Sequence, residues 1–167
     1  EVAAWLVATF LGAAHRRLLL HRDRRVRGPT RDRCGLGRAF LVADMPFMSY
    51  TNPSQALENA VRLMQEGAAM MVKLEGGASQ VKIVEHLAGH DIPVCAHLGL
   101  RPQSVHKIGG FKVQGRDQAQ AEQMLEDAVA LEQAGADILL LECVPNELGQ
   151  AVRDAVTVPV TGRARQS

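Results

Sequence analysis

The sequence contains few aromatic residues, few cysteines and no clear membrane segment, and each scarcity narrows the class of protein. Only 4% of the 167 residues are aromatic while 47% are hydrophobic, so aliphatic side chains must build most of the core. The three cysteines are far apart and odd in number, which argues against a disulfide framework or zinc knuckle and favours reduced thiols in the cytoplasm. The apolar run at residues 2–14 is too short for a membrane span, and its basic residues follow it, unlike those of a signal peptide.

The net charge is only +1, but the charge is unevenly distributed along the chain. Residues 1–38 contain nine arginines and three acidic residues, whereas residues 39–167 contain ten basic and fifteen acidic residues. A basic arm is typical of nucleic-acid or membrane binding, but this one lacks interleaved aromatic residues and any recognisable module. We therefore expect neither nucleic acid nor a membrane as a partner. We expect three segments: an atypical Arg-rich segment at 1–38, a domain at 39–160 and an atypical tail at 161–167.

From residue 39 onward, short apolar runs alternate with amphipathic segments that end at turn residues. The segment 52–67 shows the clearest helix signals, with Asn52 as the cap, Pro53 in the first turn, Gln55 as a capping-box partner and Gly67 as the stop. The predicted helices are 52–67, 78–89, 118–134 and 145–156. The predicted strands are 39–43, 68–74, 92–98, 137–143 and 158–160, the last without room to finish.

Strands that are apolar on both faces and alternate with helices indicate a parallel sheet covered by helices. An open doubly wound sheet and a (β/α)₈ barrel both fit this pattern. Polar residues at the C-terminal ends of several strands favour the barrel, because those ends meet around one mouth. A complete barrel takes about 200 residues or more. We therefore predict an α/β fold of the (β/α)₈ TIM-barrel type, incomplete at about five strands, with exposed apolar edges that reduce solubility.

Five polar residues lie at these strand ends: Asp44, Lys73, Glu75, His97 and Glu142. Asp44 and Glu75 could share Mg²⁺, which needs only one or two carboxylates, or they could be solvated loop acids. Lys73 could bind a substrate carboxylate or carbonyl, form a Schiff base, or form a salt bridge to a neighbouring acid. The residues alone favour a packed core histidine at His97. Glu142 suits a general base, or a partner for Lys73 or an arginine.

Four stretches together resemble one known family. They are LVADMPFMSY at 41–50, VKLEGG at 72–77, PVCAHLGLRPQSVHKIGGFKVQGR at 93–116 and LLLECVP at 139–145. In this order and spacing, the chain resembles ketopantoate hydroxymethyltransferase (3-methyl-2-oxobutanoate hydroxymethyltransferase) over residues 39–160. The long motif at 93–116 is the most specific part of the resemblance.

The resemblance implies a cytoplasmic, homo-oligomeric (β/α)₈ barrel that uses Mg²⁺ and 5,10-methylenetetrahydrofolate. The family transfers a one-carbon unit to the 2-oxo acid 3-methyl-2-oxobutanoate. By the matching motifs, Asp44 corresponds to a metal and substrate ligand, and Glu75 corresponds to a metal ligand. Lys73 corresponds to a residue that contacts the keto acid, Glu142 to the proton acceptor, and His97 to a residue that lines the same pocket.

The chain also departs from the family pattern. The family has two further strands before LVADMPF, and the second ends in a Gly-Asp-Ser segment that supplies a metal-site Asp and a substrate-binding Ser. No such segment is found here, and Asp23 and Asp32 lie among arginines and receive no role. A frame-shifted or mispredicted coding region would explain both atypical ends. The alternatives are a catalytically inactive fragment, or another metal-dependent 2-oxo-acid barrel enzyme of the phosphoenolpyruvate mutase type.

Overall fold

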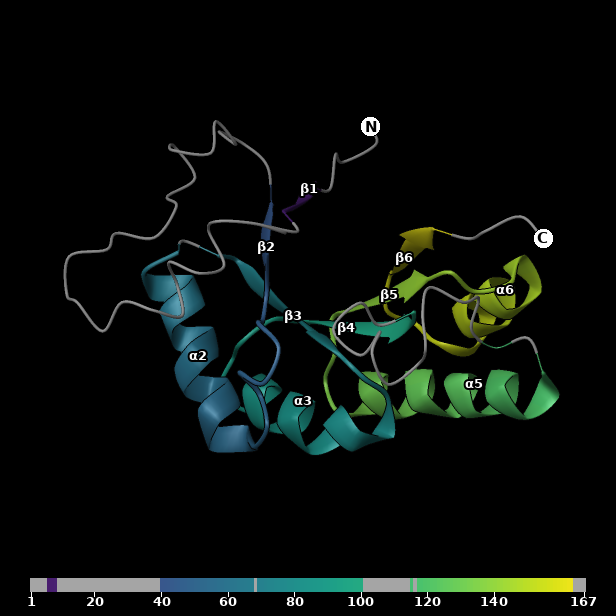
Figure 1. The fold of residues 1–167 in the computed structure, drawn as a ribbon, viewed down its shortest axis with the longest axis horizontal. Helices are drawn as coiled ribbons and strands as arrows, with labels where there is room; N and C mark the ends of the chain where they lie inside the picture. Colours follow the sequence, from purple (N-terminus) through teal and green to yellow (C-terminus); the bar gives the residue numbers. More distant parts are fainter. Residues whose placement is uncertain (1–5, 9–39, 68, 101–114, 116, 164–167) are drawn as a thin grey trace. The chain divides into compact units, whose positions relative to one another are not determined.

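A computed structural model of the chain describes residues 6–8, 40–67, 69–100, 115 and 117–163 (Figure 1). The chain forms two compact units, residues 1–73 and 74–167, whose boundary lies inside strand β3. Nearly all of the Arg-rich segment and most of the long motif at 93–116 fall outside the described residues. The described part of each unit contains parallel strands and helices.

The first unit contains β1 (Leu6–Ala8), β2 (Leu41–Asp44), α2 (Pro53–Gln65) and the start of β3 (Met71–Glu75). β1 pairs with β2 and β2 pairs with β3, in both cases parallel. β2 and β3 confirm two predicted strands. β1 was not predicted. The apolar run at 2–14 shows no alternation of apolar and polar residues, and it contains no turn signal that would mark the ends of a strand within it.

The ends of α2 follow the predicted capping signals with one difference. The side chain of Asn52 accepts a hydrogen bond from the backbone N–H of Gln55 at 3.0 Å, and Pro53 occupies the first helical position. The side chain of Gln55 does not reach back to Asn52; its Oε1 accepts from the N–H and hydroxyl of Thr51 at 2.9 and 2.6 Å. The helix start is thus fixed by two side chains that bind the backbone on either side of it.

The second unit contains the end of β3 and all the remaining elements. These are a 3₁₀ turn η1 (Ala78–Gln80), α3 (Val81–Ala88), β4 (Val94–Gly99), α5 (Gln118–Gln133), β5 (Ile138–Glu142), α6 (Asn146–Ala155) and β6 (Val160–Arg163). The segment predicted as one helix at 78–89 therefore begins with a 3₁₀ turn. α5 packs against β4, β5, α3 and α6 (Figure 1).

β4 is buried on both faces, as expected for a strand of a parallel sheet covered by helices. Its alternate residues Val94, Ala96 and Leu98 are buried on one face, and Cys95 and His97 are buried on the other. β4 pairs in parallel with β5, and β5 pairs in parallel with β6. The helices contribute their own buried stripes, which include Val84 and Leu87 of α3, Ala128 and Leu131 of α5, and Val152 of α6.

β6 corrects one prediction. The last strand was expected at 158–160 with no room to finish, but it begins at Val160, directly after Pro159, and continues to Arg163. Its register with β5 runs from Leu139↔Val160 to Glu142↔Arg163. Pro159 lacks an N–H donor and precedes the strand, while its carbonyl accepts a hydrogen bond from Leu139 at 3.0 Å.

Within each unit the strands are parallel and follow one another in chain order. This arrangement, with α2 between β2 and β3, α5 between β4 and β5, and α6 between β5 and β6, confirms the predicted α/β fold of an incomplete TIM-barrel type. In the described residues, no helix is both long and apolar enough to cross a membrane.

Glu132, near the end of α5, connects this helix to the segment before β6. Its Oε1 accepts hydrogen bonds from the hydroxyl of Thr157 at 2.7 Å, the N–H of Thr157 at 2.6 Å and the N–H of Val158 at 3.0 Å. These bonds, the one from the Thr157 hydroxyl first among them, hold the pKa of Glu132 below its ordinary value. A lowered folded-state pKa stabilises the fold above the unfolded-state pKa, and this contribution is lost as pH falls through the folded-state pKa.

We expect Glu132→Gln to reduce the free energy of unfolding by about 1 kcal/mol at neutral pH, since a neutral amide accepts these bonds more weakly. The loss should shrink on acidification, because the parent's own Glu132 becomes protonated. Urea unfolding at several pH values measures both effects. Glu126→Gln, at an exposed position on the same helix, is the control. A pH-independent difference between Glu132→Gln and the parent would contradict the assignment.

Candidate active site

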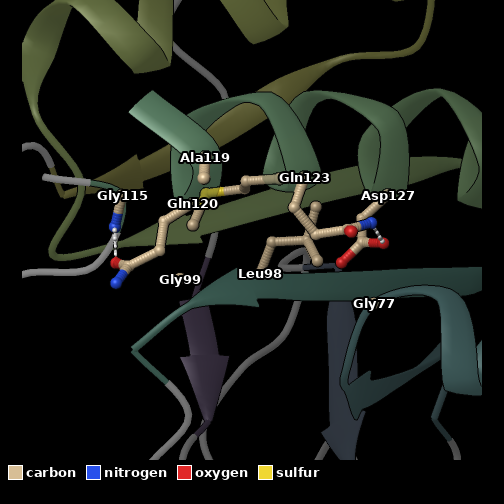
Figure 2. A pocket seen from close by; sticks show the side chains of 9 residues that line it. Gly77, Leu98, Gly99, Gly115, Ala119, Gln120, Gln123 and Asp127 are labelled. Carbon is tan, nitrogen blue, oxygen red and sulfur yellow. Dashed lines mark hydrogen bonds between the residues drawn. The ribbon is translucent and has the colours of Figure 1, made fainter. Parts of the chain in front are cut away.

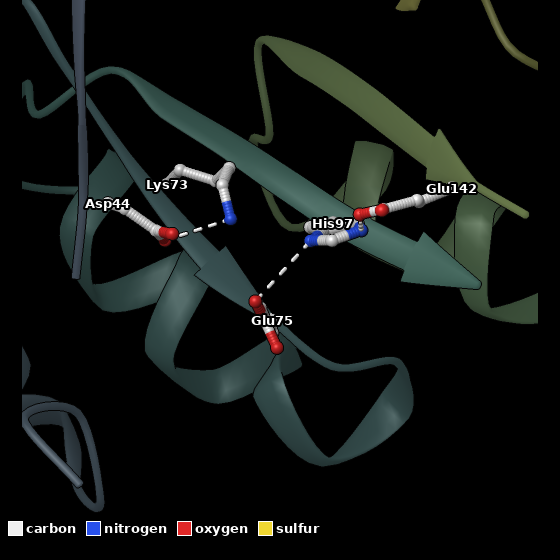
Figure 3. Close-up of polar contacts among 5 residues, drawn as sticks. All are labelled: Asp44, Lys73, Glu75, His97 and Glu142. Atoms are coloured by element: carbon white, nitrogen blue, oxygen red, sulfur yellow. Dashed lines mark ion pairs between the residues drawn. The ribbon is translucent and has the colours of Figure 1, made fainter. Parts of the chain in front are cut away.

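The first unit places Asp44 and Lys73 together. Asp44 ends β2, and it stands opposite Lys73 of β3 in the parallel register. Lys73 Nζ lies 2.9 Å from Asp44 Oδ1, and the two side chains are only 5% and 13% exposed (Figure 3). The salt bridge that the sequence left open for Lys73 is therefore present. Because both charges are largely removed from water, each depends on nearby groups of opposite charge.

β3 explains why a buried strand can end in two charged residues. Lys73 and Glu75 are two positions apart, so their side chains point to the same face of the strand. Both residues are buried, as are the apolar neighbours Val72 and Leu74 that alternate with them. The strand thus carries one apolar face and one face that presents a cation and an anion near its C-terminal end.

The second unit brings three of the predicted residues together around His97. The Nδ1 atom of His97 lies 3.6 Å from Glu75 Oε1, and its Nε2 atom lies 3.4 Å from Glu142 Oε2 (Figure 3). These contacts become ion pairs when the ring is protonated. His97 is buried, as the sequence favoured, but it lies between two carboxylates and not among apolar side chains alone. The Glu142 side chain is 37% exposed, so it can be reached from solvent.

The backbone around Glu142 is held by close contacts with the end of β4. Gly99 stands opposite Glu142 in the β4–β5 register, and the N–H of Leu100 donates to the Glu142 carbonyl at 2.8 Å. Gly99 has φ +89°, and a Cβ atom there would collide with the Glu142 carbonyl oxygen. Cys143, directly after Glu142, has φ +53°, which turns the chain sharply at the strand end. Sequence reasoning did not identify Gly99 or this turn, since a single glycine after a strand is common.

A cavity of about 380 Å³ lies on the α5 side of β4, lined by Leu98 and not by His97, its neighbour in the strand (Figure 2). The polar side chains that line this cavity form hydrogen bonds within the protein. Asp127 Oδ1 accepts from the N–H of Ala78 and from Gln123 Nε2, both at 3.1 Å. Gln120 Oε1 accepts from the N–H of Gly115 at 3.2 Å. The bonds from Ala78 and Gly115 fasten α5 to the turn after β3 and to the chain shortly before the helix begins at Gln118.

Carboxylates form the potential metal ligands of both units. The described residues contain no cluster of three or more His, Cys, Asp or Glu side chains suited to a metal ion. Mg²⁺ does not require such a cluster, because it keeps several waters and takes one or two carboxylate ligands. Glu75, with its carboxylate buried at a strand end, fits this requirement, and Asp44 fits it in the other unit.

Within each unit, parallel strands in chain order with polar residues at their C-terminal ends are typical of a domain of the TIM-barrel class. The sequence profile of the ketopantoate hydroxymethyltransferase family matches residues 30–164, and the chain belongs to that family. This confirms the resemblance seen in the motifs.

Relatives named 3-methyl-2-oxobutanoate hydroxymethyltransferase show how much of the family this chain covers. The protein from Halorhodospira halophila is 64% identical over 125 residues, which are 75% of this chain and 46% of the relative. The protein from Nitrosococcus oceani is 60% identical over 121 residues, again 46% of the relative. The chain thus spans about half the length of these relatives.

A solved structure supports the fold. The crystal structure of an isomerase from Streptomyces coelicolor A3(2) matches 75% of this chain and 33% of its own, with a TM-score of 0.52 and 19% sequence identity. At this identity the likeness concerns the architecture alone.

Proposed function

We propose that this chain transfers a hydroxymethyl group from 5,10-methylenetetrahydrofolate to 3-methyl-2-oxobutanoate, which gives 2-dehydropantoate for pantothenate and coenzyme A synthesis. Family membership, together with the arrangement of Glu142 and His97, supports the proposal. Glu142 combines what a general base needs: it is accessible from solvent, it is held at a strand end, and its carboxylate lies beside a ring nitrogen.

We propose Glu142 as the catalytic base. Its carboxylate accepts the proton on C3 of 3-methyl-2-oxobutanoate, next to the keto group, and leaves an enolate. C3 of the enolate then forms a bond to the methylene carbon of the folate, and the two C–N bonds that hold this carbon to N5 and N10 break. One water molecule supplies the hydroxyl group of the product, and its remaining proton, with the one taken by Glu142, goes to the two nitrogens of the departing tetrahydrofolate. As the family resemblance implies, His97 would line the substrate pocket, and its Nε2 atom lies 3.4 Å from Glu142 Oε2. Of the residues proposed here, only Glu142 exchanges a proton with the substrate.

We propose Asp44 and Glu75 as the ligands of Mg²⁺, with Asp44 also in contact with the substrate. When bound, the metal would supply Lewis-acid stabilisation of negative charge on the keto-acid oxygens. Lys73 adds positive charge that favours the anionic keto acid and its enolate. Because Asp44 pairs with Lys73 at 2.9 Å and Glu75 lies near His97, each proposed ligand is held by a basic side chain. As the family resemblance implies, the protein is proposed to be cytoplasmic and homo-oligomeric.

The test separates proton removal from carbon transfer. The purified chain is incubated in D₂O with 3-methyl-2-oxobutanoate and Mg²⁺, and proton NMR follows the loss of the C3–H signal. We expect exchange faster than with Mg²⁺ alone, and we expect EDTA to abolish the increase. Adding 5,10-methylenetetrahydrofolate should then yield 2-dehydropantoate. Exchange no faster than with Mg²⁺ alone would contradict the proposal.

The second candidate function is an inactive fragment that keeps part of the family fold. The observation that favours it is that residues 1–40 contain no Gly-Asp-Ser segment, which the family resemblance places before LVADMPF. This candidate predicts no exchange and no 2-dehydropantoate in the same assay, while the chain still unfolds cooperatively in urea.

A further inference from the structure

Two histidines, neither of which has been given a role above, lie together at the C-terminal end of α3. His86 is in the last turn of the helix, and His90 follows the capping residue Gly89. The helical path continues through the cap, because Gly89 N–H donates to the Glu85 carbonyl at 2.9 Å and His90 N–H donates to the Leu87 carbonyl at 3.0 Å. The two histidines therefore keep the i, i+4 spacing that places side chains on one face of a helix.

The two rings face each other closely enough to share a ligand. Their centroids are 4.6 Å apart and their planes are tilted by 56°. His90 is exposed and His86 is half-buried, so the pair opens to solvent. Neither ring forms an ion pair with another described side chain.

The position of the proton on the His90 ring follows from one hydrogen bond. Nδ1 of His90 lies 2.7 Å from the carbonyl oxygen of His86. A carbonyl oxygen can only accept, so Nδ1 carries the hydrogen and the neutral ring keeps its lone pair on Nε2. Histidines that bind metals commonly donate their other N–H to a backbone carbonyl, which fixes both the tautomer and the ring orientation. His90 has this arrangement before any metal binds.

We propose that His86 and His90 form a bidentate surface site for a late first-row transition-metal dication, with Cu²⁺ bound most tightly and Ni²⁺ and Zn²⁺ less so. Imidazole nitrogen is a preferred ligand of these ions, and their affinities follow the Irving–Williams order. Among the described residues, no third His, Cys, Asp or Glu side chain is placed to hold the same ion, so water completes the coordination shell.

Two sources of negative charge near the pair favour a cation at this position. The C-terminal end of a helix carries partial negative charge from its last carbonyl groups. Glu85 and Asp91 are exposed neighbours of the two histidines in sequence, and they add negative charge near this helix end. The site is chemically distinct from the proposed Mg²⁺ ligands, because Mg²⁺ prefers oxygen and the histidine pair offers nitrogen.

The test uses the full chain and Cu²⁺ in a non-coordinating buffer at pH 7.5, followed by isothermal titration calorimetry. We expect His86→Gln and His90→Gln each to weaken the tightest Cu²⁺ binding by at least about tenfold. Each variant has only one imidazole of the pair left, so the second metal–nitrogen bond within the same chain is lost. A tenfold excess of Mg²⁺ over protein should leave the parent's Cu²⁺ affinity unchanged. His21→Gln removes a histidine elsewhere in the chain and should preserve the tight component.

Two comparisons separate metal binding from a purely structural role of the pair. His86→Gln keeps the backbone carbonyl that His90 binds, so this variant retains the helix end even if His90→Gln loses it. Cu²⁺ should raise the thermal unfolding midpoint of the parent, but not that of His86→Gln. Equal Cu²⁺ affinity in the parent and His86→Gln, or equal stabilisation of both by Cu²⁺, would overturn the proposal. Turnover of the keto acid plays no part in either readout.

Discussion

Replacing Glu142 with Gln is expected to slow exchange of the C3 proton of 3-methyl-2-oxobutanoate by about 10²–10⁴-fold, the usual contribution of a positioned general base. The amide has nearly the same shape as the carboxylate but cannot accept the proton. Because the Glu142 side chain is partly exposed and ends its strand, the substitution should leave the fold intact. Proton NMR in D₂O with saturating Mg²⁺ measures the rate.

Glu147→Gln is the matched control for this experiment. Glu147 lies in the first turn of α6, five residues after Glu142, and is exposed. The same chemical change at this position should leave the exchange rate within about twofold of the parent, as most surface substitutions have small effects. An exchange rate for Glu142→Gln that equals the rate for Glu147→Gln would remove Glu142 as the base.

Replacing Gly99 with Ala is expected to lower the free energy of unfolding by about 3 kcal/mol, through backbone strain and steric overlap. Gly99 has φ +89°, where residues with a Cβ are disfavoured. Its new Cβ would collide with the Glu142 carbonyl oxygen and would lie 2.9 Å from Val144 Cγ1. Backbone cannot yield as a flexible side chain can, so β4 and β5 would have to separate at the site. Urea unfolding monitored by circular dichroism measures the loss.

Gly149→Ala provides the opposite expectation within the same unit. Gly149 lies inside α6, and the nearest atom to a Cβ there is Val144 Cγ2 at 3.9 Å, an ordinary contact. Alanine at a helix interior position should therefore increase stability by about 0.5–1 kcal/mol. If Gly99→Ala proved no more destabilising than Gly149→Ala, the result would contradict the inference that β4 and β5 approach too closely at Glu142 to admit a Cβ atom.

The sequence predicted those parts of the fold in which local signals agree with the tertiary structure. Asn52 and Pro53 mark the start of α2, and buried apolar runs mark β2 to β5, because capping and strand burial leave strong patterns in sequence. β1 was missed because a short strand inside a long apolar run has no boundary signal. β6 extended beyond its predicted end because pairing with β5, which the sequence does not reveal, carries it to Arg163.

The candidate site was predictable as a set of residues but not as a set of contacts. Strand-end position singled out Glu75, His97 and Glu142, and the second unit does bring these three together. Which acid faces which ring nitrogen depends on strand register and side-chain rotamers, and neither is visible in one sequence. The salt bridge of Lys73 with Asp44 was one of several alternatives, and only the β2–β3 register shows that it forms.

The strand registers also bear on the order in which the second unit folds. Leu139 of β5 pairs with Val160, 21 residues further along, whereas Cys95 of β4 pairs with Ile138, 43 residues further along. Each doubling of a closed loop costs about 0.6 kcal/mol of chain entropy, and contacts distant in sequence slow folding. We expect β5, α6 and β6 to assemble first and β4 to dock later. The backbone that carries Glu142 would then be formed before the strand that brings His97 to it.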